Sequence, residues 1–389
     1  VDPRQMFHPV KGLHSLGTGA EELFPYKGAN FWKDDELPAH LELYETNGRL
    51  GLDMDLGLRI FGAYARAMPK KSFRLVASEE YGDSTIDYPL LVDKPYAQFD
   101  SLVLRTSGQD AVSARFRDVL MTQMIKESGV DYQGYRTVVL YLNGEYWGIY
   151  NIREKINAHM LARAHGVGPE HLSILRANGS ADQGDRSHYD ELVSYARNHK
   201  LTEAEHYEKV QHMMDVENFA QYWMFQMFLS NADNGNIRFW REDSPEGRWR
   251  WILYDLDWGW RDIEPNTVNF STDPRGTGAD QAFQTILLRR LLANDDFREM
   301  FLRYCGQHLQ TTFEPNRALA LIDMLAKEIE SEIPADRKRW RNTYKDWGQE
   351  IELMRQFARE RPEHFRAHLQ RYFRLSDEQM VLYGITEPD

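Results

Sequence analysis

The chain has 389 residues, which at ~150 residues per domain allows two or three domains or one large two-lobed one. Hydrophobic residues make up 42% and charged residues 28%, the composition of a folded protein, which excludes disorder of the whole chain. The formal net charge is −13, so the overall basic surface that nucleic-acid binding uses is missing, and we expect no nucleic-acid partner. The one cysteine, Cys305, excludes an intrachain disulfide and a zinc or iron–sulfur site made of cysteines.

No apolar run approaches the ~18 residues that a membrane-spanning helix needs, so we expect no membrane span. The sequence starts Val1-Asp2-Pro3, without an initiator methionine or an apolar signal core, as in a mature chain whose export signal has been removed. We therefore expect a secreted or cell-envelope protein, with the spore coat and the cytoplasm as alternatives.

The chain from about residue 38 to 106 has the patterns of β-strands. Apolar residues alternate with other residues from Leu50 to Ile60, which is typical of a strand with one buried face. The Asn47-Gly48 pair just before it indicates a hairpin turn. The next elements expected along the chain are strands over 71–75 and 102–105, a helix over 110–127 and a hairpin over 137–152.

After Glu154 the spacing becomes mostly helical. Asp215 is expected to cap a strongly apolar helix that runs to about Leu229. A short hairpin follows, 237–240 with 249–253, and amphipathic helices are expected over 280–373. The pattern predicts an α+β fold with two lobes, a β-rich N-lobe of residues 1–155 and a mainly helical C-lobe of residues 156–389.

Several common catalytic motifs are missing from the sequence. Residues 57–62 have the glycine spacing of a phosphate loop, but Ala63 follows where such a loop needs Lys and then Ser or Thr. There is no G-x-G-x-x-G after a strand, no H-E-x-x-H and no G-x-S-x-G. These absences argue against a Rossmann dehydrogenase, a zincin protease and an α/β-hydrolase.

The first candidate for nucleotide binding is the turn at residues 57–62, which includes Arg59 and Gly62, with the lysines that follow it. A turn with bared backbone N–H groups, followed by a lysine on the next strand, holds nucleotide phosphates in kinase-like folds. Strand parity favours Lys71 over Lys70, because Lys71 shares its face with Phe73. The alternative is a tight hairpin with solvated lysines.

Two carboxylates are candidates to support that nucleotide site. Asp118 lies on the helix after the sheet, where it could pair with Lys71 as the helix glutamate does in protein kinases, or form an ordinary surface ion pair. Glu154 lies at the lobe junction, where exposed backbone commonly binds a purine edge. A plain salt bridge between the two lobes is an equally good interpretation of Glu154.

The strongest candidate is a pair of acidic segments that emerge from apolar elements. Residues 231–236 follow the apolar helix, and residues 254–257 follow an apolar strand. Carboxylates there are costly without a cation or a hydrogen-bond network, and oxygen ligands of this kind suit Mg²⁺ or Mn²⁺ with a triphosphate. Asp255 and Asp257 point the same way, and 257–259 has the D-x-G form of the kinase magnesium motif. An acidic turn capped by asparagines, or a structural calcium site, is the alternative.

These stretches together resemble the CotH family, the spore-coat-protein-H-like atypical protein kinases. The matching residues are 57–60, 69–75, 104–105, 117–118, 141–150, 154, 231–236 and 254–257, in the family's order. The resemblance implies an atypical protein-kinase fold that binds ATP and a divalent metal, and members that phosphorylate serine in coat proteins. The chain lacks the His-Arg-Asp triplet of ordinary protein kinases.

The resemblance also implies roles for single residues. Lys71 would hold phosphates, Asp233 and Asn236 would form the catalytic segment, and Asp255 or Asp257 would hold metal together with Asn236. Asp257 would thereby take part in catalysis. Arg59, Gly62, Asp118 and Glu154 would complete the cofactor site.

We therefore predict ATP- and metal-dependent transfer of a phosphoryl group to Ser or Thr of a protein substrate, for which the acidic chain weakly favours a basic protein. The alternatives are a non-catalytic cell-surface or envelope binding module on the same fold, and transfer of AMP.

Overall fold

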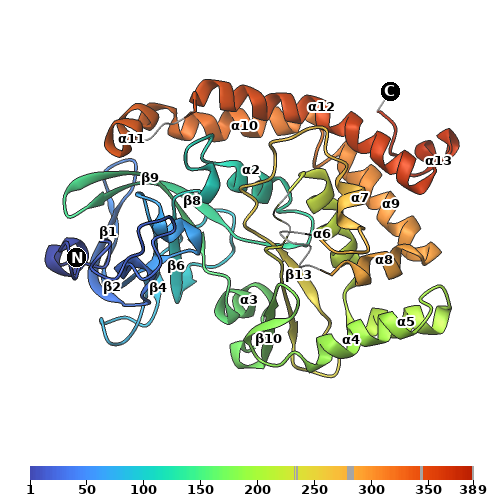
Figure 1. The fold of residues 1–389 in the computed structure, drawn as a ribbon, viewed down its shortest axis with the longest axis horizontal. Coiled ribbons are helices and arrows are strands. Elements are labelled where there is room, and N and C mark those ends of the chain that lie inside the picture. The colour runs from blue at the N-terminus through green and yellow to red at the C-terminus, as the bar shows by residue number, and fades with distance from the viewer. Residues whose placement is uncertain (232, 234, 278–283, 342–344, 388–389) are drawn as a thin grey trace. The chain divides into compact units, whose positions relative to one another are not determined.

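The computed structural model describes residues 1–389 except 232, 234, 278–283, 342–344 and 388–389. These residues divide into two compact units, each assembled from three segments of the chain (Figure 1). Unit 1 contains residues 1–115, 133–164 and 327–345, and unit 2 contains residues 116–132, 165–326 and 346–389. The lobe boundary expected after residue 155 lies inside the second segment of unit 1.

Unit 1 is built on a six-stranded antiparallel sheet. In spatial order its strands are β1 (Leu37–Tyr44), β2 (Leu50–Phe61), β3 (Ser72–Val76), β6 (Ser101–Arg105), β9 (Glu145–Glu154) and β8 (Tyr135–Leu142). The β8–β9 hairpin turns at Asn143 and Gly144, both with positive φ, as the Asn-Gly pair predicts. A separate two-stranded sheet pairs β4 (Ile86–Asp87) with β5 (Gln98–Phe99).

The alternation in β2 marks the core of unit 1, as the sequence predicts. The buried side chains of this strand are those of Leu52, Met54, Leu56, Leu58 and Ile60. They belong to one hydrophobic cluster with Phe73 and Leu75 of β3. The cluster therefore sets which face of the sheet the side chains of β3 turn toward the core.

Three helices accompany this sheet. They are α1 (Pro3–Phe7), α3 (Ala158–His165), which lies in unit 1 except for its last residue, and α11 (Ile333–Trp340). Helix α11 comes from the far end of the sequence and packs beside β9 (Figure 1). The sequence pattern gives no reason to place a segment after residue 330 on the β-rich unit.

The helix expected over 110–127 is shorter in the structure. A single 3₁₀ turn covers Gly108–Asp110, and the α-helix, α2, spans only Arg117–Met124. Ser107 and Arg115 both have positive φ, at 73° and 77°, which breaks the helical backbone on either side of the turn. Periodic apolar spacing alone does not reveal these two left-handed residues.

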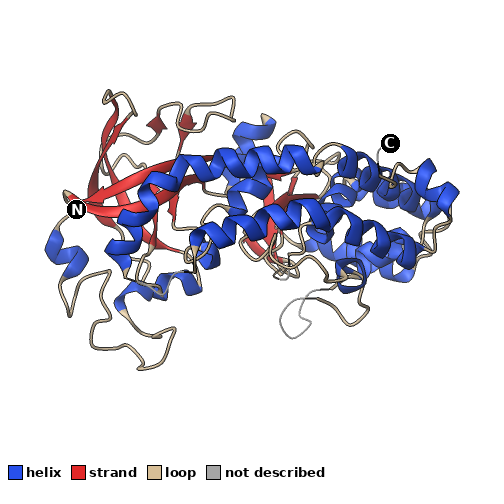
Figure 2. Cartoon of the chain, turned by 90° about the horizontal axis from the view of Figure 1, so that it is seen from above, coloured by secondary structure: helices blue, strands red, loops and turns tan. Residues whose placement is uncertain are grey.

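Unit 2 is mainly helical (Figure 2). Besides α2, its helices are α4 (Ser187–Asn198), α5 (Ala204–Met213), α6 (Val216–Phe228), α7 (Thr267–Ser271), α8 (Ile286–Leu292), α9 (Asp295–Gln310), α10 (Pro315–Ile329, which runs on into unit 1), α12 (Trp347–Phe373) and α13 (Asp377–Leu382). Its sheet has the order β11 (Ser180–Gln183), β10 (Leu172–Arg176), β12 (Arg238–Glu242), β13 (Arg250–Leu253) and β7 (Asp131–Tyr132), of which only β13 and β7 pair in parallel. Within the described ranges, no helix has the length and apolar character that crossing a membrane requires.

The apolar helix and hairpin predicted in this unit are both present. Asp215 caps α6 by accepting the backbone N–H of Asn218, at 3.0 Å. Asn218 in turn pairs with the backbone of Trp251 in β13, accepting its N–H at 2.6 Å and donating to its carbonyl at 3.3 Å. Helix α6 and strand β13 are therefore fixed side by side. The fold as a whole is the α+β fold that the sequence predicts.

Candidate functional site

Lys71 lies just before β3 and is buried, with 3% of its surface exposed. Its Nζ donates to the carbonyls of Arg66 at 2.6 Å and Met68 at 2.9 Å, and lies 3.9 Å from the centroid of the Phe31 ring. Among the described residues of unit 1 no carboxylate lies within ion-pair distance of this ammonium. Burial therefore lowers the pKa of Lys71 to about 8. This is a cation held by dipoles alone.

Lys70 is buried as well, so strand parity does not separate the two lysines. Its Nζ lies 2.5 Å from Oδ1 of Asp336 on α11 and donates to the carbonyl of Ile149 at 2.7 Å. Burial lowers the pKa of Lys70 to about 8, against the opposing pull of Asp336. Lys70 has a carboxylate partner and Lys71 has none among the described residues of unit 1, which sets Lys71 apart.

The turn after β2 needs a glycine at position 62, where φ is +113°. Arg66 donates from its side chain to the Gly62 carbonyl at 2.7 Å and from its backbone N–H to the Ala63 carbonyl at 3.1 Å, so side-chain and backbone bonds together close the turn. Arg59, predicted to contact the cofactor, forms an ion pair with Glu36 and is about two-fifths exposed. Gly62 thus belongs to a tight turn beside Lys71, while Arg59 is engaged by a neighbouring carboxylate.

Glu154 ends β9 and is 2% exposed. Its carboxylate lies 3.3 Å from Nζ of Lys94 and accepts hydrogen bonds from the Tyr96 hydroxyl and, at 2.8 Å, from the Gly134 N–H. These partners all lie in unit 1. The salt bridge of Glu154 with Lys94 is therefore made within unit 1 and is not the bridge between lobes that the sequence suggested, and a role toward the purine stays a prediction.

In unit 2, polar residues that follow α6 form hydrogen bonds with one another and with the end of this helix. Asn231 donates to the side chain of Gln226 at 2.9 Å and accepts the backbone N–H of Asp233 at 3.2 Å. Asp233 is half-buried, and burial together with the charge of Asp255 raises its pKa. A carboxylate whose charge is disfavoured in this way is one that a cation would stabilise.

The two acidic segments meet at Asn236. Its Nδ2 donates to Oδ2 of Asp233 at 3.0 Å and to Oδ2 of Asp255 at 2.8 Å. One amide group therefore bridges the two carboxylates, as expected from polar segments that follow a helix and a strand packed side by side. The backbone N–H of Trp260 also donates to the carbonyl of Leu229, at 2.8 Å, which ties the end of α6 to the second segment.

The backbone around Asp255 is held in an uncommon conformation. Asp255 has a φ of +55°, and the next N–H, that of Leu256, donates to Oδ1 of Asp118 at 3.0 Å. Asp118 is 3% exposed, so its carboxylate is a buried support for the segment from Asp255 to Asp257. The pairing of Asp118 with Lys71 stays a prediction.

Asp257 is buried, with 5% exposed. Its carbonyl accepts Nε of Arg261 at 3.1 Å and another guanidinium N–H at 2.9 Å, which closes the turn after β13. Trp258 is 41% exposed, and the Arg261 guanidinium lies 4.9 Å from its ring centroid. The aromatic residue at the centre of this D-x-G sequence therefore faces solvent.

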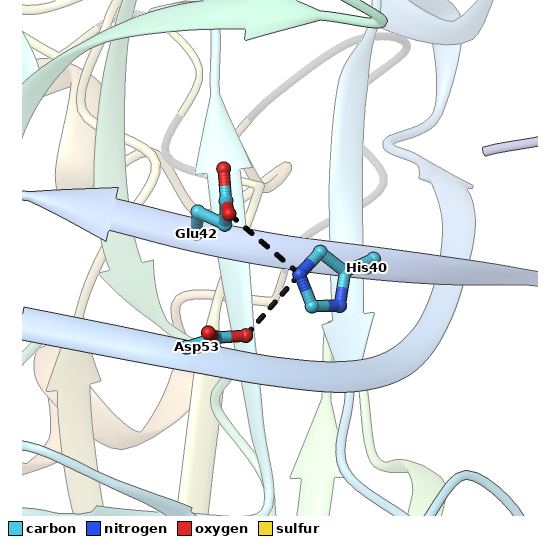
Figure 3. Close-up of side chains that lie close together, drawn as sticks. All are labelled: His40, Glu42 and Asp53. Carbon is cyan, nitrogen blue, oxygen red and sulfur yellow. Dashed lines mark ion pairs between the residues drawn. The ribbon is translucent and has the colours of Figure 1, made fainter. Parts of the chain in front are cut away.

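Figure 3 shows a further group of metal-ligating side chains, on β1 and β2. Among the described residues, His40, Glu42 and Asp53 place one ligand atom each within 4.8 Å of one another, and all three are exposed. Nδ1 of His40 also lies 2.9 Å from Asp55, and this hydrogen bond raises the pKa of His40. An imidazole among exposed carboxylates forms a surface hydrogen-bond and ion-pair network, which needs no metal.

Sequence reasoning did not find Asp336, Lys94 or the His40 group. Asp336 is 266 residues from Lys70, so no local spacing links them. Lys94 lies in a segment with few regular elements. The alternation of His40 with Glu42, and of Asp53 with Asp55, on two expected strands was the one usable signal.

Comparison with known protein families identifies a family that the chain matches. A model of a protein family, described as CotH kinase protein, matches residues 58–365. This range covers most of the chain and includes every predicted site residue from Arg59 to Asp257, and Asp336. No curated protein matches the sequence.

Proposed function

The chain belongs to the CotH kinase family, and from this premise we propose that it is an ATP- and metal-dependent protein kinase that phosphorylates Ser or Thr. The observation that carries the proposal is the bridge that Asn236 makes between Asp233 and Asp255. It gathers carboxylate and amide oxygens on a rigid support, and Mg²⁺ and Mn²⁺ prefer such oxygen ligands. The raised pKa of Asp233 fits a site that is short of positive charge.

Each residue has a role in this proposal. Asp255 or Asp257, with Asn236, would hold the metal, which when bound neutralises charge on the phosphates. Asp233 accepts the proton of the substrate hydroxyl and orients it. The Lys71 ammonium donates to phosphate oxygens, exchanging its two carbonyl partners for charged ones, which is a gain of charge-assisted hydrogen bonds.

One observation bears on the binding-module alternative, and a difference in chemistry separates AMP transfer from phosphoryl transfer. The Phe31 ring against the Lys71 ammonium favours a non-catalytic binding module, in which this lysine is structural. Transfer of AMP uses the same ATP and metal groups but attacks the α-phosphate. ATP labelled separately at the α- and γ-phosphates distinguishes these reactions.

The test begins with thermal-shift titration of the protein with ATP and Mg²⁺ or Mn²⁺, followed by transfer of label to a generic basic protein. The proposal expects metal-dependent ATP binding and label only from the γ-position. Asp255→Asn/Asp257→Asn should lose transfer, and the exposed Asp262→Asn serves as the matched control. Label from the α-position would support AMP transfer, and no ATP binding with either metal would support the binding module.

A further inference from the structure

Asp336 is a fully buried carboxylate of α11, with all the partners named here in unit 1. Its Oδ1 accepts Nζ of Lys70 at 2.5 Å and the backbone N–H of Ile149 at 2.9 Å, and its Oδ2 pairs with Arg115. One carboxylate thus joins β9, the residue before Lys71 and the strained turn ahead of α2. Figure 1 shows α11 beside β9.

Two neighbouring residues of β9 also form hydrogen bonds with Lys70 and Lys71. Lys70 donates to the Ile149 carbonyl at 2.7 Å, while the Ile149 N–H donates to Asp336. The next residue, Tyr150, donates its hydroxyl to the carbonyl of Lys71 at 2.9 Å. The side chain of Lys70 is therefore bonded to Ile149 and the backbone of Lys71 to Tyr150, and Asp336 bonds to both Lys70 and Ile149.

There is little space between this carboxylate and the backbone at Gly148. Gly148 has a φ of +104°, and a Cβ added there would lie 2.0 Å from Oδ1 of Asp336 and 3.1 Å from Nζ of Lys70. The carboxylate therefore contacts bare backbone. A buried anion with two cationic partners and a backbone donor has one favourable position.

We propose that Asp336 is a positioning residue for nucleotide binding, which fixes Lys70 and thereby holds the Lys71 ammonium in place for phosphate. The proposal rests on the assignment of Lys71 to phosphate binding in the proposed function. In protein kinases a glutamate on a helix holds the phosphate lysine directly. Here the support comes from a helix after residue 330 and acts through the neighbouring lysine.

A purely structural role for Asp336 makes a different prediction, because α11 has other anchors on the same hairpin. The hydroxyl of Tyr146 donates to Glu332 at 3.0 Å, and Nε1 of Trp340 donates to the Trp147 carbonyl at 2.9 Å. If Asp336 only secured the helix, loss of Glu332 would affect ATP binding as loss of Asp336 does. Glu332→Gln is therefore the matched control.

The experiment compares Asp336→Asn, Glu332→Gln and the unaltered chain in two assays. The first measures the ATP dissociation constant, and KM for ATP against kcat. The second measures competitive acetylation of Lys71, read by mass spectrometry without nucleotide, so that it does not depend on ATP binding. Asp336→Glu, which keeps the charge, is measured alongside and replaces Asp336→Asn if that variant does not fold.

Positioning predicts that Asp336→Asn weakens ATP binding on the order of tenfold with kcat little changed, since the coupling of packed neighbours is typically of that size. Acetylation of Lys71 should become on the order of tenfold faster, because the ammonium leaves its buried carbonyls more often. Asp336→Glu should restore part of both, and Glu332→Gln should change neither.

Unchanged acetylation of Lys71 in folded Asp336→Asn, or equal effects of Glu332→Gln, would overturn the positioning role. Faster acetylation in a chain that binds no ATP would instead overturn the proposed function and with it the assignment to nucleotide, while leaving the coupling of Asp336 to Lys71 established. The two failures are therefore distinguishable.

Discussion

Replacing Lys71 and Lys70 by methionine should separate stability from nucleotide binding. At about 1.36 kcal/mol per pKa unit, lowering the pKa of Lys71 from 10.5 to about 8 means that its charged form costs about 3 kcal/mol in the folded state. Lys71→Met removes that cost but leaves the carbonyls of Arg66 and Met68 without their donor, at about 1 kcal/mol each. The free energy of unfolding at pH 7 should therefore rise slightly or stay within about 1.5 kcal/mol of the unaltered chain.

Lys70→Met should behave in the opposite way. It leaves the buried carboxylate of Asp336 with Arg115 and one backbone donor, and breaking a buried ion pair typically costs 3–5 kcal/mol. Because Arg115 remains, we expect about 3 kcal/mol. Lys209→Met, at an exposed position of α5, is the control for the substitution itself.

The measurements are urea unfolding and ATP binding for each variant. Lys71→Met should lose ATP affinity worth about 1.5–3 kcal/mol, the size of a hydrogen bond to a charged group, without losing stability. Lys70→Met should lose stability, with a smaller effect on ATP affinity per folded molecule. The reasoning is refuted if Lys71→Met binds ATP normally while Lys70→Met does not, because Lys70 would then be the phosphate lysine.

The pH dependence of the free energy of unfolding is a second, independent measurement of the effect of Lys71. The folded pKa of Lys71, about 8, lies below its ordinary value of 10.5, so between these two values the unfolded chain binds more protons. Stability contributed through this residue therefore rises as pH increases from about 8 to 10.5. The unaltered chain should gain up to about 3 kcal/mol over Lys71→Met across that window.

Three further predictions concern unit 2. Asp255→Asn and Asp257→Asn should each abolish or strongly reduce phosphoryl transfer with melting temperatures within a few degrees of normal, since removing one charge from an anionic cluster relieves repulsion; normal transfer by the double variant would exclude the metal role. Burial lowers the pKa of His308 from its ordinary 6.5 to about 4, so between these values the unfolded chain binds more protons than the folded one. The free energy of unfolding should therefore fall as pH drops from about 6.5 to 4. His308→Gln should reduce this pH dependence, which urea unfolding at pH 5 and 7 measures. Arg361 donates to the carbonyls of the last residues of α6, so Arg361→Met should lower the free energy of unfolding by about 3 kcal/mol, and a calorimetric loss below about 1 kcal/mol would contradict this.

The sequence predicts those parts of the fold that depend on local periodicity. The alternation in β2, the Asn-Gly turn between β8 and β9 and the capped apolar helix α6 are all set by neighbouring residues, and all are found. The start of α2 at Arg117 could not be predicted, because it depends on two left-handed residues whose side chains do not favour that conformation. Helix α11 could not be placed, because its contacts with the β-rich unit, among them the buried charge of Asp336, join residues far apart in the sequence.

The candidate site divides in the same way. The meeting of Asn236 with Asp255 follows from a helix and a strand that pack together and each deliver polar residues at their ends. The partners of Lys70, Lys94 and Glu154 do not follow from spacing, because burial makes any charge seek its opposite wherever the chain brings one. Long-range ion pairs are therefore the part of this site that only coordinates reveal.

Each of the two units contains a charged side chain that its surroundings stabilise incompletely, and this bears on the proposed binding of a metal and a triphosphate. In unit 1 the Lys71 ammonium is satisfied by carbonyl dipoles, and its lowered pKa shows that they do not fully replace water. In unit 2 the carboxylate of Asp233 shares an amide with that of Asp255, and its pKa, raised by burial and then by the charge of Asp255, shows that the amide does not fully offset these two effects. A cation and an anion that are each stabilised incompletely gain more from a bound metal–triphosphate than fully paired groups would. Burial lowers the pKa of Lys70 to about 8 as well, but its ammonium is already paired with the Asp336 carboxylate, which is why we assign phosphate to Lys71 and support to its neighbour.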